Sequence, residues 1–154
     1  MPTHAVTSVF HTGLTVTNLD RAVGFFRDVF GFEVEETTEA DATFIQRLTG
    51  VVTARGARLA FVRASGHTLE LLEYQEATEP HIKGLRPCDP GFAHIAFTVE
   101  GIDDLIAQCR HAGYEPYQPI LVLDDERMRG TRVVYLRGPD NISIELIEWR
   151  KFPS

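Results

Sequence analysis

Apolar and polar side chains alternate over the first stretch of the chain, as they do in a half-buried strand. The apolar side chains then recur at helical spacing as far as Gly31, a residue suited to end a helix, and Asn18 or Asp20 can cap its start. Alternation returns afterwards, and Ala64-Ser65-Gly66 marks a hairpin turn. The elements predicted for the first half are a strand (6–16), a helix (19–30), a strand (32–37), a short helix or irregular lid (42–48) and two strands (58–64 and 67–74).

The second half repeats this order after a connector at 75–90, which is rich in proline and has no periodicity. Its predicted elements are a strand (92–99), a helix (102–112) and three strands (114–118, 131–136 and 142–148). The sequence Gly138-Pro139-Asp140-Asn141 is a strong turn signal before the last strand. Each half therefore follows the order β-α-β-β-β.

This internal repeat predicts the architecture. One helix cannot cover both faces of a sheet, so two such units are expected to combine into a cup-shaped mixed sheet with the helices outside. We therefore expect an α+β fold of two tandem βαβββ modules. The 154 residues form a single predicted domain, with module one at about 6–74, a linker at 75–90 and module two at about 91–149.

The repeat also duplicates two chemically distinctive side chains. Each first strand carries a histidine, His11 or His94, and each last strand carries a glutamate, Glu70 or Glu145, among apolar neighbours. A second glutamate follows three residues later in each case, on the opposite face of the strand. A single histidine on an apolar strand is more often a hydrogen-bonded core residue. Two matched His and Glu residues instead favour a four-ligand site for a divalent cation, because unpaired buried carboxylates are costly.

Composition limits the possible partners. A net charge of −7 argues against nucleic-acid binding, and no apolar run approaches the length of a membrane span. Cys88 and Cys109 lack the spacing of a metal or disulfide framework, and no signal peptide is evident, so we expect a cytoplasmic protein with reduced cysteines. The expected partner is a small-molecule substrate.

Several motifs resemble the vicinal oxygen chelate superfamily, which includes glyoxalase I, methylmalonyl-CoA epimerase, extradiol dioxygenases and fosfomycin-resistance proteins. The resemblance extends over about residues 6–149 and rests on four segments: His11-Thr-Gly-Leu-Thr-Val-Thr-Asn-Leu-Asp-Arg, Leu69-Glu-Leu-Leu-Glu-Tyr, Gly91-Phe-Ala-His-Ile-Ala-Phe-Thr-Val and Gly138-Pro-Asp-Asn-Ile-Ser-Ile-Glu-Leu-Ile-Glu. It implies the metal ligands His11, Glu70, His94 and Glu145, the same set as the repeat. It also implies one divalent metal ion per site (Zn, Ni, Co, Mn or Fe) and a homodimer.

The favoured reaction is a metal-dependent epimerisation or isomerisation of a small hydroxyketone, such as a cyclitol-like one, through a metal-stabilised enolate. Glu70 or Glu145 would be both ligand and base. In ligand set the chain resembles the 2-epi-5-epi-valiolone epimerases of this superfamily. A glyoxalase I-type lactoylglutathione lyase is the main alternative. However, Thr15 and Tyr74 stand where that enzyme carries an arginine and an asparagine for glutathione.

Two further alternatives come from other functional classes. An extradiol dioxygenase would use only His, His and Glu, so Glu70 argues against it. A non-catalytic binding or resistance protein would lack the ligand set. The charged segment 124–130 resembles a mobile loop over the glyoxalase I site. The predicted substrate contacts are Arg127, Met128 and Arg129 from this loop, and Phe97 and Tyr135 from the wall of the cup.

Overall fold

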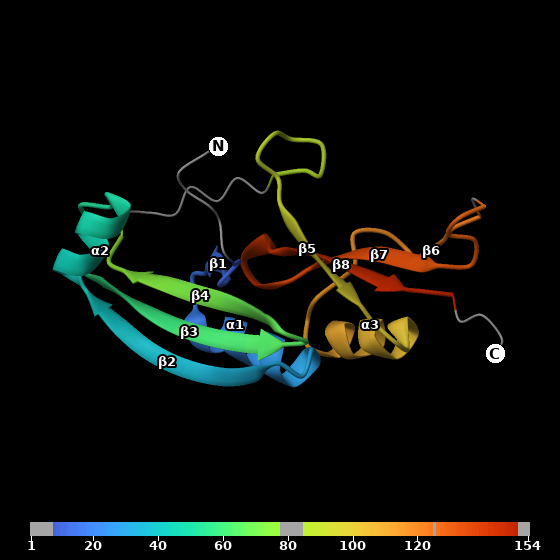
Figure 1. Cartoon of the computed structure of the whole chain (residues 1–154), viewed down its shortest axis with the longest axis horizontal. Coiled ribbons are helices and arrows are strands. Elements are labelled where there is room, and N and C mark those ends of the chain that lie inside the picture. The colour runs from blue at the N-terminus through green and yellow to red at the C-terminus, as the bar shows by residue number, and fades with distance from the viewer. Residues whose placement is uncertain (1–7, 78–84, 125, 151–154) are drawn as a thin grey trace. The chain divides into compact units, whose positions relative to one another are not determined.

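The computed structural model describes residues 8–77, 85–124 and 126–150. The chain divides into two compact units, Met1–Pro80 and His81–Ser154, and the division falls inside the predicted connector. Each unit contains one four-stranded mixed sheet and a long-range parallel strand pair (Figure 1). Within the described residues, no helix has the length and apolar run needed to cross a bilayer.

The first unit confirms the predicted β-α-β-β-β order. Its elements are β1 (Thr12–Thr15), α1 (Leu19–Gly24) continued by a π-helical turn η1 (Phe25–Val29), β2 (Glu33–Asp41), α2 (Ala42–Thr49), β3 (Gly56–Ala64) and β4 (His67–Gln75). The sheet order is β1-β4-β3-β2. β1 runs parallel to β4, whereas the β2–β3 and β3–β4 pairs are antiparallel.

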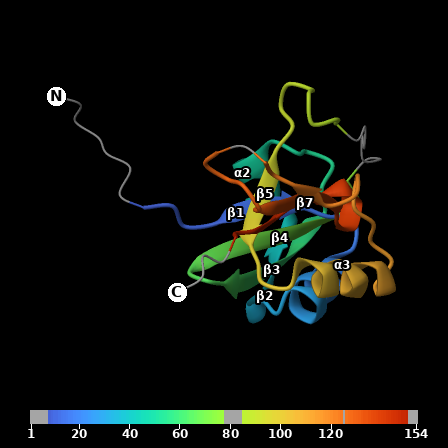
Figure 2. The same cartoon turned by 90° about the vertical axis from the view of Figure 1, so that its right-hand side faces the viewer.

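The second unit has the same topology. Its elements are β5 (His94–Thr98), α3 (Ile102–His111), β6 (Leu121–Val122), β7 (Arg132–Arg137), a 3₁₀ turn η2 (Pro139–Asn141) and β8 (Ser143–Glu148). The sheet order is β5-β8-β7-β6, with β5 parallel to β8. Figure 2 shows α3 on one side of the strands of this unit. The α+β fold of two βαβββ modules is confirmed.

Two local predictions differ from the structure, and for a third segment one of the two alternatives is confirmed. β1 begins only at Thr12, because its partner β4 pairs with it from Leu69 onward. The segment 114–118 is not a strand but makes a single bridge, Pro116 to Leu136, which is flanked by hydrogen bonds from Tyr117 N–H to Tyr135 O and from Arg137 N–H to Glu115 O. The ambiguous segment 42–48 is a helix, α2, capped by Asp41.

The helix of each unit covers one face of its sheet with buried apolar side chains. In the first unit, buried residues of α1 and η1 lie with Val62, Leu69 and Leu71 of the sheet in the core. In the second unit the corresponding buried side chains are Ile102, Ile106 and Cys109 of α3 and Leu136, Ile144 and Leu146 of the sheet. The other face of the first sheet is partly covered, because Ile45 of α2 packs with Ala57 and Leu59.

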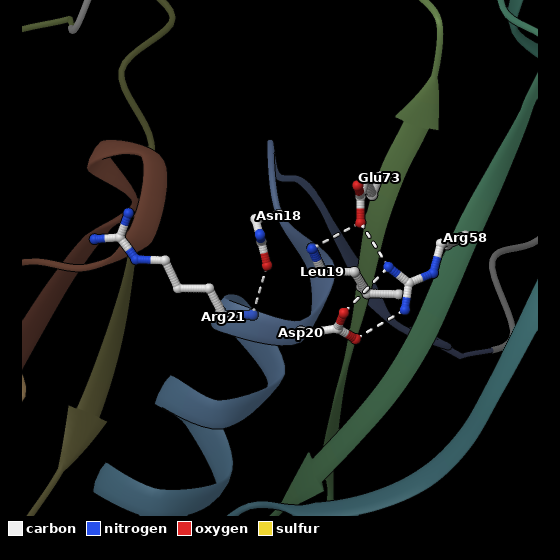
Figure 3. A network of polar contacts seen from close by, with 6 residues as sticks. All are labelled: Asn18, Leu19, Asp20, Arg21, Arg58 and Glu73. Atoms are coloured by element: carbon white, nitrogen blue, oxygen red, sulfur yellow. Dashed lines mark hydrogen bonds and ion pairs between the residues drawn. The ribbon is translucent and has the colours of Figure 1, made fainter.

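A polar network ties the start of α1 to its sheet (Figure 3). The N–H of Leu19 donates to Glu73 on β4 at 2.9 Å, and Asn18 Oδ1 accepts an N–H of the first helical turn at 2.8 Å. The Arg58 guanidinium on β3 donates to Glu73 at 3.2 Å and to Asp20 at 2.8 Å. These contacts satisfy N–H groups that have no partner inside a helix and place negative charge at its positive end.

Candidate functional site

A histidine and a glutamate meet in the first unit because its first and last strands are neighbours. His11 immediately precedes β1, and Glu70 lies on the parallel strand β4. The two atoms His11 Nε2 and Glu70 Oε2 are 3.1 Å apart, and both side chains are largely covered. Gly13 is the residue paired with Glu70, and a Cβ at that position would lie 3.5 Å from Glu70 Oε2. A methyl group would fit at Gly13 in ordinary contact with the carboxylate, whereas a larger side chain would crowd it.

The second unit repeats this pair. His94 begins β5, and Glu145 lies on the parallel strand β8. His94 Nε2 and Glu145 Oε2 are 3.3 Å apart. The residue paired with Glu145 is Ala96, again a small side chain. The repeated strand pairing therefore builds one His–Glu pair in each unit.

Strand alternation separates the two glutamates of each last strand, as expected. Glu73 and Glu148 lie on the helix face, where both accept backbone N–H groups at a helix start. Glu70 and Glu145 lie on the opposite face, beside the histidines. The second glutamate of each repeat thus binds the start of a helix. The first glutamate, Glu70 or Glu145, makes no such contact within the described residues and is available to bind a metal or a substrate.

The donor atoms of each pair suit a divalent cation. Ligand bonds of about 2.0–2.2 Å at angles near 90–110° put neighbouring donors roughly 2.9–3.5 Å apart, which includes both measured separations. His11 Nδ1 is buried and has no hydrogen-bond partner among the described residues, so protein contacts alone do not satisfy this imidazole. In the described part of the chain, no cluster of three or more candidate ligands occurs. Each unit supplies two donors.

An aromatic ring stands beside each pair at a matching position. Phe61 on β3 is paired with Glu70, and its ring lies 5.9 Å from the His11 ring. Tyr135 on β7 is paired with Glu145, and its ring lies 5.2 Å from the His94 ring. Burial, and then the nearby Glu145 carboxylate, raise the pKa of Tyr135. Its hydroxyl is therefore neutral and available as a hydrogen-bond donor beside Glu145.

Two of the predicted substrate contacts can be placed by register. Tyr135 shares a face with Glu145, because directly paired strand residues lie on one side of a sheet. Phe97 is paired with the buried Leu146 and lies on the opposite face from His94. Phe97 therefore belongs to the helix-covered face and does not share the face of the His–Glu pair, contrary to the expectation that it lines the same wall as Tyr135.

The predicted substrate loop connects β6 to β7. Its backbone is closed by a hydrogen bond from Gly130 N–H to Leu123 O at 2.7 Å, and the Arg129 side chain donates to Asp124 O at 3.3 Å. Arg127 and Arg129 are exposed, and Met128 is half-buried. A substrate role for these three residues stays a prediction.

Sequence reasoning missed a polar cluster on the same face as Glu145. The Tyr117 hydroxyl lies 2.8 Å from the hydroxyl of buried Ser143, and the Arg137 guanidinium lies 4.4 Å from the centre of the Tyr117 ring. Arg137 is paired with Ser143 across β7 and β8. Alternation along β7 from Tyr135 would have indicated the face of Arg137. Tyr117 lies outside any strand, and no sequence pattern pointed to it.

Comparison with known proteins finds a matching family model and a similar curated protein. The model of the Glyoxalase/Bleomycin resistance protein/Dioxygenase superfamily matches residues 8–146. A 2-epi-5-epi-valiolone epimerase from Actinomyces sp is 33% identical over 147 residues, which are 91% of this chain and 78% of that protein.

Two solved structures share the fold. A glyoxalase family protein from Bacillus cereus has a TM-score of 0.83 and 24% identity, with 98% of this chain and 99% of that chain covered. The fosfomycin resistance protein FosX from Listeria monocytogenes, complexed with Mn(II) and sulfate, has a TM-score of 0.61 and 18% identity, with 95% of each chain covered. The family match covers most of the chain and agrees with the duplicated βαβββ topology, so this chain belongs to the Glyoxalase/Bleomycin resistance protein/Dioxygenase superfamily.

Proposed function

We propose that this protein is a metal-dependent epimerase or isomerase that moves a proton next to the carbonyl of a small hydroxyketone, such as a cyclitol-like one. The observation that carries the proposal is the repeated contact of a histidine Nε2 with a glutamate Oε2, at 3.1 Å in one unit and 3.3 Å in the other. The similarity to a 2-epi-5-epi-valiolone epimerase supports this type of reaction.

The proposed metal ligands are His11, Glu70, His94 and Glu145. The proposal requires the two pairs to come together, either within one chain or across two chains of a homodimer. Imidazole nitrogens and carboxylate oxygens suit Zn, Ni, Co, Mn or Fe, and the related FosX was solved with Mn(II). A divalent cation held by these four side chains would act as a Lewis acid that acidifies the carbon next to a bound carbonyl.

The protein's own groups would handle the proton. One carboxylate, Glu70 or Glu145, takes the proton from the carbon, and returning it to the other face inverts the centre. Phe61 and Tyr135 flank the two carboxylates and would limit access of water. The Tyr135 hydroxyl, kept neutral by its raised pKa, would donate a hydrogen bond to a substrate oxygen.

A glyoxalase I-type lyase is the second candidate, because it would use the same four ligands. Tyr74 argues against it. Its side chain stands where that enzyme would place an amide for glutathione, and here it packs against the cluster of Ile45, Ala57 and Leu59. Thr15, at the position expected for a glutathione-binding arginine, has no cationic group to pair with a carboxylate.

The first experiment is elemental analysis of the purified protein and of the variants His11→Ala, Glu70→Ala, His94→Ala and Glu145→Ala. We expect about one divalent ion per site in the parent protein and loss of that ion in each variant. His67→Ala is the matched control, since His67 is an exposed histidine on β4 whose ring nitrogen lies 3.1 Å from the Thr12 hydroxyl, and this variant should retain the metal. Absence of metal even after addition of Zn, Ni, Co, Mn and Fe would refute the proposal.

The second experiment separates the two reactions. Hydroxyketones are incubated with the metal-loaded protein in deuterated water, and incorporation at the carbon next to the carbonyl is followed by NMR. An epimerase exchanges this proton without glutathione, whereas a glyoxalase I-type lyase acts only on a glutathione adduct. Exchange that survives complete chelation of the metal would contradict the mechanism.

A further inference from the structure

A small cavity of about 150 Å³ lies within the second unit, apart from the His94–Glu145 pair. Its lining residues are Leu85, Arg86, Pro87, Tyr117, Arg137 and Asn141. The volume corresponds to several water molecules, so it has room for a group the size of a phosphate or a carboxylate. The chemistry of its lining indicates which kind of group it would accept.

Arg137 is the distinctive cation of this cavity. Among the described residues of the unit, Arg86, Arg110 and Arg132 each form an ion pair with a carboxylate. Arg137 forms none within the described residues. Its guanidinium instead lies over the Tyr117 ring, 4.4 Å from the ring centre. Arg137 is exposed, and because no carboxylate of the described residues pairs with it, its guanidinium is available to an anionic ligand.

The groups around Arg137 are held firmly. The backbone at Tyr117 is fixed by a hydrogen bond from its N–H to Tyr135 O at 2.8 Å, and its ring packs edge-on against Tyr135. Its hydroxyl is 2.8 Å from the hydroxyl of Ser143, which is only 4% exposed. Two hydroxyls that share one hydrogen bond still have one unused proton between them, so this pair keeps a donor for a ligand.

Arg137, which lines the cavity, lies on the same face of the second unit's sheet as His94 and Glu145. Arg137 is paired with Ser143, and Ser143 is two residues from Glu145 along β8, so all three share a face. Two residues of a strand span roughly 7 Å. A ligand that reaches from Glu145 to Arg137 would therefore carry its charged group several bonds away from its reacting carbon.

We propose that Arg137 and the Tyr117–Ser143 hydroxyl pair, together with Asn141, form a subsite for an anionic group, a phosphate or a carboxylate, of the substrate. The claim that the anion belongs to the substrate rests on the function proposed above. The claim that an anion binds there stands on the cavity, the unneutralised cation and the hydroxyl donor. It makes the substrate class a hydroxyketone that carries a negative charge remote from its carbonyl.

The test is a titration of the full-length protein with inorganic phosphate, and separately with acetate, followed by NMR of the arginine side chains and the amides. Metal is first removed with a chelator, so that the anion cannot be counted as a metal ligand. We expect shifts at Arg137 and Tyr117, and an affinity for phosphate that falls about 10-fold or more in Arg137→Ala. Arg137→Lys should retain part of the affinity, and Tyr117→Phe should weaken binding about 3-fold while keeping the ring beneath the guanidinium.

Two matched variants make the result specific. Arg110→Ala removes an arginine that is paired with Glu115 and lies outside the cavity, and it should bind phosphate like the parent protein. Glu145→Gln should lose metal but keep phosphate binding, whereas Arg137→Ala should keep metal. Failure of the subsite and failure of the metal proposal are thereby distinguishable.

Comparison of the two anions distinguishes a phosphate from a carboxylate as the charged group of the substrate. Tighter binding of phosphate than of acetate supports a phosphorylated substrate, and the reverse supports a carboxylate. Equal binding of phosphate by Arg137→Ala and the parent protein would overturn the inference, as would shifts that lie away from the cavity.

Discussion

Arg132 makes in the second unit the same two contacts that Arg58 makes in the first. Arg58 bridges Glu73 and Asp20, at 3.2 and 2.8 Å, and Arg132 bridges Glu148 and Asp103, at 3.0 and 2.6 Å. Each arginine faces its glutamate across an antiparallel strand pair, and each aspartate is the second residue of a helix that precedes both strands, α1 or α3. We call each set of one arginine, one glutamate and one aspartate an arginine clamp. The two clamps join the helices to the sheets at equivalent points.

Loss of a clamp should destabilise the protein without touching the candidate ligands. We expect Arg58→Ala to lower the free energy of unfolding measurably, because it removes charged hydrogen bonds from a half-buried glutamate. Chemical denaturation measures this change. Arg63→Ala removes a single, more exposed ion pair with Glu35 and should cost less than about 1 kcal/mol. Equal effects of the two substitutions would show that the clamp has no special role.

Glu148 should make stability depend on pH. Backbone hydrogen bonds from Ile102 and Gly101, together with Arg132, lower the pKa of Glu148 in the folded state from its ordinary value of 4.5. Its stabilising contribution is therefore complete above about pH 4.5 and is lost as the pH falls through the folded pKa.

The variant Glu148→Gln tests this linkage. It should lower the free energy of unfolding by about 1–2 kcal/mol at pH 7, and its difference from the parent protein should shrink below pH 4.5. Denaturant curves at a series of pH values measure the difference. Glu33→Gln, on the exposed start of β2, should change stability by less than about 0.5 kcal/mol. A pH-independent difference would refute the role of the Glu148 charge.

We expect the size of the side chain at position 13 to change metal affinity through steric contact with the Glu70 carboxylate. A Cβ at this position lies 3.5 Å from Glu70 Oε2, an ordinary contact, so Gly13→Ala should bind metal normally. Gly13→Val adds two methyl groups beside the carboxylate and should weaken metal binding about 10-fold. Valine favours strands, so the loss should occur without unfolding. Metal titration followed by calorimetry gives the affinities, and unchanged binding in Gly13→Val would exclude Glu70 as a ligand.

The two cysteines should differ sharply in reactivity. Burial raises the pKa of the Cys109 thiol to about 11, so this thiol is protonated and covered at neutral pH. Cys88 is exposed. We therefore expect one rapidly reacting thiol per native chain with a chromogenic disulfide reagent, abolished by Cys88→Ser, and a second one only after denaturation. Two rapid thiols in the native protein would contradict the buried position of Cys109.

The repeat and the alternation of side chains predicted most of the fold because both depend on local pattern. The order of strands and helices in both units and the separation of Glu70 from Glu73 were correct. The bounds of the short edge strand β1 were not predicted correctly. Its length depends on where β4 offers free hydrogen-bonding groups, which is a property of the tertiary structure. The bridge at Pro116 reflects the same dependence on a distant partner.

The candidate ligands could be recognised from the sequence because duplication made four ordinary residues informative. The arginine clamps and the Tyr117–Arg137 cluster could not, because each joins residues whose meeting depends on strand register. Arg132 meets Asp103 only when β7 and the start of α3 are placed against each other. Phe97 follows His94 by three residues on β5, so the alternation of side chains already indicates the opposite face, and its pairing with Leu146 agrees with this.

The parallel pairing of β1 with β4 determines when, during synthesis, the pair of His11 and Glu70 can form. His11 leaves the ribosome early, but its partner Glu70 lies on the last strand of the unit, and the hairpin of β3 and β4 must form before β1 has an edge to join. A growing chain therefore exposes no paired His and Glu until its first unit is almost fully synthesised. The second pair, His94 and Glu145, depends in the same way on the parallel pairing of β5 with β8, so the two His–Glu pairs form one after the other along the chain.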